Sequence, residues 1–552
     1  MIYPKIPLAQ SILQICLDQR LTHIVISPGS RNAPLTIGFA NNPDFTCYSI
    51  ADERCAAFFA MGIAQQTKKP VALLCTSGSA LLNYYPAVAE AFYSQIPLVV
   101  ISADRPQDKI DIGDGQTIRQ QNVYANHILY NANLTEEASV ENDTKISQAI
   151  TTAIRRKGPV HINAPFEEPL YNTVSELSVQ LKPTIQPLPK RKFFENIEEA
   201  VFLWNWAKKK LVLVGVNEPN VIEQSVINQL AADPSVVVMT ETTSNLHHDS
   251  FINSIDTFIT PFTEEEFETY RPTILITFGG MVVSKRVKAW LRNHKPQEHW
   301  HIDTLRAYDT FGALTRHFKA EPNELLQRLL NGSITVESNY NATAQALKAL
   351  REKKHKEYLA KIPFSDFKVF EMILPALPSN SQLQISNSSA IRYAQLFTLN
   401  PTIEVFCNRG TSGIDGSTST AIGAALASKK QTTLITGDIS FLYDSNALWN
   451  AYIPKNFKII LLNNGGGGIF RILPGHSETP VFNTYFETSH CFTAEHLAKM
   501  YGFDYYTASD EATLTATLLK FIQANGKPQL LEVFTPTLDN DKILLQYFKE
   551  LV

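Results

Sequence analysis

The chain has 552 residues, which is too long for one hydrophobic core, so roughly two to four domains are expected. Its 44% hydrophobic and 18% charged residues are typical of a globular protein in water. The formal net charge of −4 argues against non-specific binding to nucleic acid, and no nucleic-acid partner is expected.

The start of the chain and its cysteines favour the cytoplasm. Residues 1–5 lack the charged-then-apolar pattern of a secretory signal, and no run of about 18 apolar residues predicts a membrane span. The six cysteines are scattered without metal-ligand spacing, which is typical of free thiols in a reducing compartment. We therefore expect a cytoplasmic protein without a membrane span.

The first part of the chain alternates strand-like apolar runs with helix-like stretches. The runs cover residues 23–26, 46–50, 71–75 and 97–101, and each ends in a polar or glycine-containing turn. Such alternation predicts a parallel sheet that is covered on both faces. We predict a first domain over residues 1–181.

A linker and a second α/β block follow. Residues 182–195 contain three prolines and four basic residues and are interpreted as a linker. Strand-like runs at 211–214, 235–239 and 273–276 then predict a middle domain over residues 196–340.

The last part of the chain resumes the alternation after a charged, helix-like stretch at 344–361. We predict a third α/β domain over residues 360–552. Its strand-like runs cover residues 383–385, 403–406, 432–435, 458–462 and 529–533.

Eight polar clusters directly follow strand-like runs. Ligands bind outside the carboxyl ends of the strands in open α/β sheets. One such cluster is more often a simple turn or a surface group, but eight at the same topological place favour a binding site. The clusters are Ser27–Arg31, Asp52–Arg54, Thr76–Ser79, Asp104–Pro106, Asn387-Ser388, Asn408–Gly410, Gly437-Asp438 and Asn463-Asn464.

Asp438 and Asn464 stand at the ends of two strand-like runs and are candidate metal ligands. Carboxylate and amide oxygens suit Mg²⁺, which commonly bridges a protein to phosphate. The glycines at 465–468 let the backbone approach a diphosphate closely. The alternative is a helix N-cap at Asp438 and a turn at Asn464.

The segment Gly437-Asp438-Ile439-Ser440, followed by Asn463-Asn464, resembles the signature of thiamine-diphosphate enzymes. The resemblance implies thiamine diphosphate as cofactor, with Asp438, Asn464 and the carbonyl of Gly466 holding Mg²⁺, or Mn²⁺, on its diphosphate. Ile439 stands where glycine is common, a departure shared by one branch of the family.

Further motifs resemble that branch, which acts in menaquinone biosynthesis. The resemblance implies decarboxylation of 2-oxoglutarate and addition of its four-carbon remainder to isochorismate. The most discriminating motifs are Gln116–Arg119 and Ser284–Arg286. The others include Ser27–Arg31, Asp52–Arg54, Asn408–Gly410, Ser412–Gly416 and Ile469-Phe470.

The family resemblance also implies an architecture. It consists of three doubly wound α/β domains with mostly parallel sheets, in the order pyrimidine-binding, middle and diphosphate-binding. The cofactor would lie between the first domain of one subunit and the third of another, so Glu53 and Asp438 of different chains would serve one site. A homodimer or homotetramer is therefore expected.

The resemblance assigns roles to individual residues. Glu53 would share a proton with the aminopyrimidine ring of the cofactor; the alternative is a carboxylate favoured by a helix N-terminus. Ser388, Arg392 and Arg409 would hold the part derived from 2-oxoglutarate. Ser30, Arg31, Arg105, Gln116, Lys285 and Arg286 would orient isochorismate and product. Ile414, Gly437, Ile439, Ser440 and Gly467 would contact the cofactor, and Ile469, Phe470 and Leu473 would line the reacting side.

The basic residues support dicarboxylate substrates independently, because the guanidinium fork suits planar carboxylates. Two other hypotheses stay open at this point. One is a different thiamine-diphosphate-dependent 2-oxo-acid decarboxylase or carboligase, and the other is a non-catalytic relative that binds anions.

Overall fold

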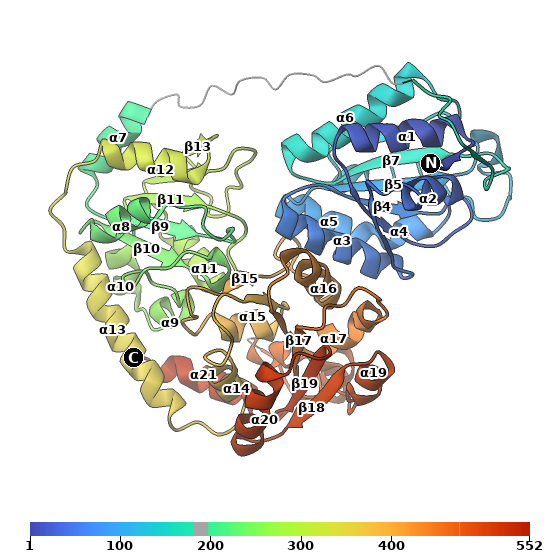
Figure 1. Ribbon diagram of the computed structural model, residues 1–552. Helices are drawn as coiled ribbons and strands as arrows, with labels where there is room; N and C mark the ends of the chain where they lie inside the picture. The colour runs from blue at the N-terminus through green and yellow to red at the C-terminus, as the bar shows by residue number, and fades with distance from the viewer. Residues whose placement is uncertain (181–196, 474) are drawn as a thin grey trace.

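The computed structural model describes residues 1–180, 197–473 and 475–552. Within them, strands form two six-stranded sheets, one five-stranded sheet and a two-stranded pair (Figure 1). The predicted linker over residues 182–195 lies outside the described residues. None of the described helices is long and apolar enough to cross a membrane.

All strands of the first sheet run parallel in the order β3-β2-β4-β5-β7-β6, which confirms the predicted parallel sheet. Its strands are β2 (His23–Ile26), β3 (Thr46–Ser49), β4 (Val71–Cys75), β5 (Leu98–Asp104), β6 (Asn131–Asn133) and β7 (Val160–Pro165). Its helices are α1 (Pro7–Asp18), α2 (Ala33–Ala40), α3 (Glu53–Thr67), α4 (Ala80–Asn83), α5 (Tyr85–Ser94) and α6 (Val140–Arg156), and β1 (Tyr3–Pro4) pairs antiparallel with β8 (Thr173–Val174).

The apolar runs are continuous because both faces of this sheet are buried. Successive strand residues point to opposite faces. Ile24 and Ile26 pack in one core cluster, whereas Val25 between them packs in another that includes α3 and α5.

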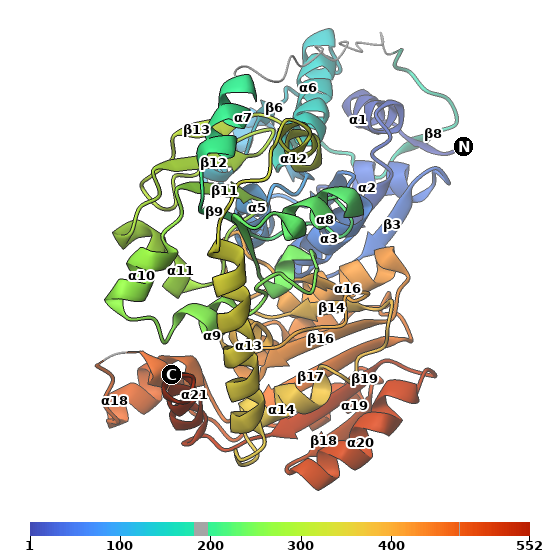
Figure 2. The same cartoon turned by 90° about the vertical axis from the view of Figure 1, so that its left-hand side faces the viewer.

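The middle sheet is also parallel, in the order β10-β9-β11-β12-β13. Its strands are β9 (Lys210–Val214), β10 (Val236–Thr240), β11 (Ile274–Phe278), β12 (Glu298–Ile302) and β13 (Arg316–Phe318). Its helices are α7 (Ile197–Trp206), α8 (Gln224–Ala232), α9 (Ile255–Ile259), α10 (Glu264–Tyr270), α11 (Lys285–Asn293) and α12 (Pro322–Asn331). The charged stretch predicted at 344–361 is α13 (Tyr340–Leu359), which runs from the middle sheet towards α21 (Figure 2).

The third sheet, β15-β14-β16-β17-β19-β18, repeats the strand order of the first, counted along the chain as second, first, third, fourth, sixth and fifth. Its strands are β14 (Gln382–Ile385), β15 (Glu404–Phe406), β16 (Thr432–Gly437), β17 (Phe457–Asn463), β18 (Asp504–Ala508) and β19 (Gln529–Phe534). Its helices are α14 (Asp366–Ile373), α15 (Ser389–Ala394), α16 (Ser417–Ser428), α17 (Asp438–Tyr443), α18 (Pro480–Phe482), α19 (Glu495–Met500), α20 (Glu511–Gln523) and α21 (Asn540–Glu550).

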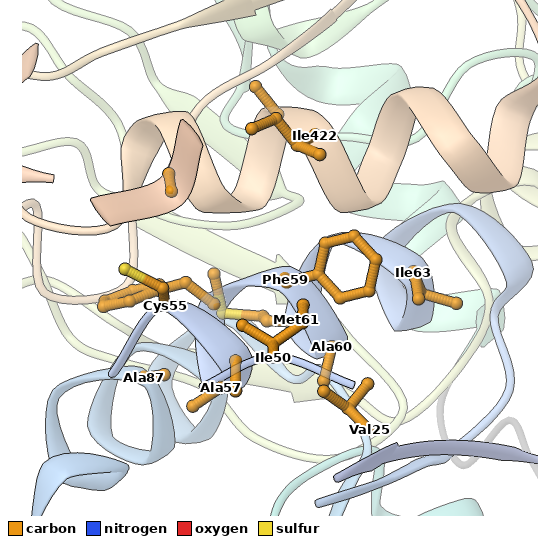
Figure 3. Close-up of a cluster of buried hydrophobic side chains, with 14 of the residues drawn as sticks. Val25, Ile50, Cys55, Ala57, Phe59, Ala60, Met61, Ile63, Ala87 and Ile422 are labelled. Carbon is orange, nitrogen blue, oxygen red and sulfur yellow. The ribbon is translucent and has the colours of Figure 1, made fainter. Parts of the chain in front are cut away.

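Helices α3 and α16 join the first and third sheets into one core, and Figure 3 shows Phe59 and Ile422 on the two facing helices. Glycines allow the close approach. A Cβ at Gly62 would lie 2.1 Å from the carbonyl oxygen of Thr420, and a Cβ at Gly423 would lie 2.1 Å from that of Phe59.

Replacing Gly423 with alanine is expected to destabilise this contact. Alanine favours a helix by about 1 kcal/mol over glycine, but its methyl group would force α16 away from α3, and overpacking typically costs about 1–3 kcal/mol. We expect a lower melting temperature by calorimetry. Gly526→Ala is the matched control, since a Cβ there meets nothing within 4 Å. Equal melting temperatures for both variants would contradict the tight helix contact.

The topology places all eight predicted clusters at the carboxyl ends of strands. Four follow the neighbouring strands β3, β2, β4 and β5, and four follow the neighbouring strands β15, β14, β16 and β17. The sequence-based placement is confirmed, and each set of four lies along one sheet edge.

Candidate active site

Asp438 is the first residue of α17 and holds the loop that follows β17. Its Oδ2 accepts hydrogen bonds from the backbone N–H groups of Gly465 (2.9 Å) and Gly466 (3.0 Å), and its Oδ1 accepts one from Ile439 (2.7 Å). Burial raises the pKa of Asp438, and these backbone donors and His490 oppose that shift. The carboxylate thus joins the carboxyl ends of two neighbouring strands.

Asn464 directly follows β17, and both its backbone carbonyl and its side-chain amide are hydrogen-bonded. Its backbone carbonyl accepts a hydrogen bond from Thr537 Oγ1 (2.6 Å), and its Nδ2 donates to Asp366 Oδ2 (3.0 Å). Burial raises the pKa of Asp366 to about 6, and the nearby carboxylate of Asp438 adds to the shift. The two carboxylates therefore lie close together around Asn464.

These residues fit the predicted cation, because a carboxylate, an amide and a loop carbonyl are the oxygen ligands of a hard divalent ion. His490 Nε2 lies 3.3 Å from Asp438 Oδ2 but has no hydrogen-bond partner, so the site contains an unsatisfied buried polar atom. Within the described residues, no cluster of three His, Cys, Asp or Glu side chains could hold a metal.

Residues 483–490 fasten the glycine loop from its outer side. Gly467 donates its N–H to the carbonyl of Glu487 (2.6 Å), and His490 donates its N–H to that of Gly465 (2.9 Å). The Glu487 carboxylate pairs with Arg471, whose Nη2 lies 2.6 Å from Oε2, and both side chains are buried. Contacts within the protein therefore position the glycine loop.

Ser388 and Asn387 organise the neighbouring edge, after β14. Ser388 has φ +70° and ψ −129°, a strained conformation for a residue with a side chain, and such strain is typical of functional sites. Asn387 Nδ2 donates to the carbonyls of Asn408 and Gly413 (2.7 Å each), and its Oδ1 accepts from Arg409 Nη1 (2.7 Å). Asn387 thus orients the guanidinium of Arg409.

Glu90 of α5 holds the loop of Arg409 from the first region of the chain. It is 1% exposed and accepts hydrogen bonds from the N–H groups of Gly410 (2.6 Å) and Thr411 (2.6 Å). Sequence reasoning missed Glu90. The only available signal was a carboxylate among the apolar residues 87–91 of a helix.

Arg392 and Arg409 belong to a group of charges that also includes Lys288. Burial, and then the positive charge of Arg409, lower the pKa of Arg392. Burial also lowers the pKa of Lys288, and the carboxylate of Glu241 opposes that shift. Lys288, which no sequence motif singles out, lies on α11 and donates to the carbonyl of Val282 (3.0 Å). Three cations in one place suit a substrate with several carboxylates.

Lys285 and Arg286 begin α11, after the N-cap residue Ser284. The guanidinium carbon of Arg286 lies 4.6 Å from the ring centroid of Phe548, so Arg286 stacks on α21. Its charge also acts on the half-buried carboxylate of Asp256. The roles of Lys285 and Arg286 in binding isochorismate stay predictions.

Glu241 anchors the start of α11. Its carboxylate accepts the N–H groups of Val283 and Ser284 at 2.7 Å each, while Ser284 Oγ donates to Asp256. Burial raises the pKa of Glu241 to about 7, from 4.5.

The raised pKa of Glu241 predicts a pH-dependent stability. Below pH 4.5 the carboxyl is protonated in both the folded and unfolded states, whereas between pH 4.5 and 7 only the unfolded state ionises fully. The stability of the wild type relative to Glu241→Gln should fall across this window by up to about 3 kcal/mol and then level off. Melting temperatures of both proteins from pH 4.5 to 8 test this, and a constant difference would contradict it.

Arg31 and Arg105 form a second basic group, at the edge of the first sheet. Arg31 is 3% exposed, donates from Nη1 to the carbonyl of Phe166 (2.9 Å) and pairs with Glu168 Oε1 (3.2 Å). Burial, and then the positive charge of Arg105, lower the pKa of Arg31. Arg105 pairs with Asp114 at 3.6 Å.

Gln116 and Ser30 lie in the same region. Gln116 has φ +54° and backs onto Gly78, whose added Cβ would lie 3.4 Å from its Cα. Ser30 is exposed. In the described part of the chain, no hydrogen bond or ion pair links these residues to the group around Arg392.

Glu53 is the first residue of α3, and the residues on either side of it in sequence contact the chain that follows β16. Asn446 Nδ2 donates to Asp52 (2.8 Å), and Arg54 donates to the carbonyl of Tyr443 (2.7 Å). The junction that carries Glu53 therefore lies against α17 and the turn after it, within one chain. The expectation that two chains share each site stays a prediction.

The apolar candidates surround the same edge of the third sheet. Ile414 is half-buried, and its carbonyl accepts a hydrogen bond from Ser440 Oγ (2.6 Å). Ile469 lines a small cavity of about 20 Å³ together with Asn464 and Arg392, so three predicted site residues meet there. Phe470 is half-buried next to it, and Leu473 is 44% exposed.

Three family descriptions match the chain in order. The N-terminal TPP-binding domain of thiamine pyrophosphate enzymes matches residues 6–127, their middle domain matches 184–385, and their C-terminal TPP-binding domain matches 388–533. The α/β class with three domains is thereby confirmed, while the limits 1–181, 196–340 and 360–552 stay predictions.

Curated relatives match the chain from end to end. A protein of Flavobacterium johnsoniae is 68% identical over 553 residues, and one of Flavobacterium psychrophilum is 69% identical over 551, each covering 100% of both chains. A protein of Christiangramia forsetii is 52% identical over 99% of both chains. All three are named 2-succinyl-5-enolpyruvyl-6-hydroxy-3-cyclohexene-1-carboxylate synthase.

The family predicted from Asp438, Asn464 and the flanking motifs is thus confirmed. The chain belongs to the 2-succinyl-5-enolpyruvyl-6-hydroxy-3-cyclohexene-1-carboxylate synthase family of thiamine-diphosphate enzymes.

Proposed function

We propose that this protein joins 2-oxoglutarate to isochorismate in menaquinone biosynthesis. The bond between C1 and C2 of 2-oxoglutarate breaks with loss of CO₂, and the remaining four carbons form a new carbon–carbon bond to the isochorismate ring. The observation that carries the proposal is the site itself, where Asp438 holds the loop that begins after Asn464, and Asn464 lines a cavity with Arg392, whose charge interacts with those of Arg409 and Lys288.

We propose that Asp438, Asn464 and the carbonyl of Gly466 hold Mg²⁺ or Mn²⁺, and through it the diphosphate of the cofactor. Thiamine diphosphate, when bound, supplies the carbon nucleophile and the electron sink that decarboxylation needs. The protein supplies position and charge. The Asp438 carboxylate, which three backbone N–H groups hold in place, is suited to supply charge at a fixed position. The half-buried Ile414 is suited to help position the cofactor.

We propose that different residues bind the two substrates. Arg392 and Arg409, with the strained Ser388, are proposed to bind the carboxylates of 2-oxoglutarate. Arg31, Arg105, Gln116, Lys285 and Arg286 are proposed to orient isochorismate. Glu53 is proposed to exchange a proton with the aminopyrimidine ring.

From the family resemblance we propose that each site is shared by two subunits of a homodimer or homotetramer. The group around Arg31 in one chain would then face the group around Arg392 in another. Mixing inactive Glu53→Gln and Asp438→Ala chains tests this, because a mixed dimer contains one site with both defects and one with neither. Recovered turnover supports shared sites, and no recovery after verified subunit exchange contradicts them.

A cytoplasmic location is part of the proposal, supported by six free cysteines. The competing activity is decarboxylation of another 2-oxo acid. Release of CO₂ from 2-oxoglutarate and from pyruvate, each with the cofactor and Mg²⁺, separates the two. A clear preference for 2-oxoglutarate supports the proposal, whereas a preference for pyruvate would support the other decarboxylase.

A further inference from the structure

Asp366 lies beside the proposed metal site but outside every motif of the sequence. It is the first residue of α14 and is 3% exposed. Its Oδ2 accepts the hydrogen bond from Asn464 Nδ2 (3.0 Å), and its Oδ1 accepts one from Thr535 Oγ1 (2.6 Å). The carboxylate therefore connects α14 to the ends of β17 and β19.

Capping of α14 does not explain this buried carboxylate. A carboxylate at a helix N-terminus can stabilise the helix by accepting its free N–H groups. Here Ser365 does so, accepting from Lys368 N–H (3.3 Å). Both oxygens of Asp366 instead accept hydrogen bonds from side chains outside α14. Its own backbone N–H donates to Asn540 Oδ1 (2.8 Å).

The contact decides which end of the Asn464 amide is free. An asparagine side chain carries a donor end, Nδ2, and an acceptor end, Oδ1. Turning the amide over exchanges the two ends, so its hydrogen bonds decide which end points to a metal site. An ionised carboxylate only accepts hydrogen bonds, so Asp366 selects the Nδ2 end and leaves Oδ1 directed away from itself. Because a cation binds oxygen and not the amide nitrogen, this selection is what the proposed ligand needs.

We propose that Asp366 is a positioning residue that sets the orientation of Asn464 as a metal ligand and adds a second negative charge next to Asp438. The inference rests on the proposed metal site. Partners of this kind, which touch a ligand but not the metal, typically change metal affinity about 10–100-fold when they are replaced.

A charge swap tests the proposal. Asp366→Asn can present its amide N–H to Asn464 and turn the Asn464 amide over, so that Oδ1 faces residue 366, while Asn464→Asp places two carboxylates about 3.0 Å apart. Each single variant is expected to lower Mn²⁺ affinity by about 10–100-fold. In the double variant, the amide at 366 donates to the carboxylate at 464 and restores the arrangement, so affinity should recover to within about tenfold of the wild type.

The measurement is electron paramagnetic resonance of free Mn²⁺ during titration of each full-length protein at saturating thiamine diphosphate. Thr535→Val is the matched control. It removes the other partner of Asp366 and leaves the contact with Asn464, so its Mn²⁺ affinity should stay within about threefold of the wild type. Melting temperatures show which variants are folded.

The outcomes separate the inference from the function on which it rests. Recovery in the double variant supports the proposal, even if one single variant folds poorly. A folded Asp366→Asn variant with unchanged affinity, or a double variant no better than both single variants, overturns it. Absence of cofactor-dependent Mn²⁺ binding in the wild type would overturn the proposed metal site as well.

Discussion

Replacement of Asp438 by alanine is expected to lower the joint affinity for Mg²⁺ and thiamine diphosphate by at least about 100-fold, since a direct ligand should matter more than an outer partner. The variant loses the carboxylate oxygen proposed for the metal. It also frees the N–H groups of Gly465 and Gly466, which that carboxylate holds at 2.9 and 3.0 Å. Both losses act on the same loop.

Calorimetric titration of the cofactor, with and without Mg²⁺, measures this effect. Asp510→Ala is the matched control, because Asp510 is a surface N-cap that accepts the N–H of Thr513 (2.8 Å) and lies in the same region of the chain. If Asp438 served only as a helix-terminal carboxylate, both variants would lose a little stability and keep the cofactor. Unchanged cofactor affinity in Asp438→Ala would remove this residue from the ligand set.

Replacement of Glu53 by glutamine is expected to lower turnover by about 10²–10⁴-fold, the range for loss of a general acid–base group. Glutamine keeps the size of the side chain but cannot exchange the proton. The only side-chain hydrogen bond of Glu53 in the described residues comes from Asn83 Nδ2 (3.2 Å), which the glutamine carbonyl can accept. The melting temperature and cofactor affinity should therefore change little.

Steady-state turnover and cofactor binding together test this prediction. Glu136→Gln is the matched control, since it makes the same change at an exposed position in the first region. Turnover of Glu53→Gln within about threefold of that control would contradict a proton-transfer role. A large loss of cofactor binding would instead show a structural contribution from Glu53.

Much of the site's location could be predicted because its scaffold is local in sequence. Buried parallel strands contain continuous apolar runs, as at β4, β5 and β17, and the polar residues that follow each run lie at or near the carboxyl edge. The strand β12 was not predicted because its sequence lacks such an apolar run. It reads Glu-His-Trp-His-Ile, and its polar residues hide the strand from a search for apolar runs.

The residues that hold the site in place could not be predicted, because their partners are distant in sequence. Glu90 meets Gly410 across 320 positions, and Asp366 meets Asn464 across 98. In sequence, Asp366 looks like an ordinary helix carboxylate, and Glu90 differs from one only in its apolar neighbours at 87–91. The stacking of Arg286 on Phe548 likewise depends on how α21 packs.

The most direct test of the central claim is mass spectrometry of the products formed by purified protein with thiamine diphosphate, Mg²⁺, 2-oxoglutarate and isochorismate. Each component is omitted in turn. The account predicts a product whose mass equals both substrates minus CO₂, formed only when all four are present. Loss of CO₂ without that product, or no turnover with cofactor bound, would contradict the proposed coupling reaction.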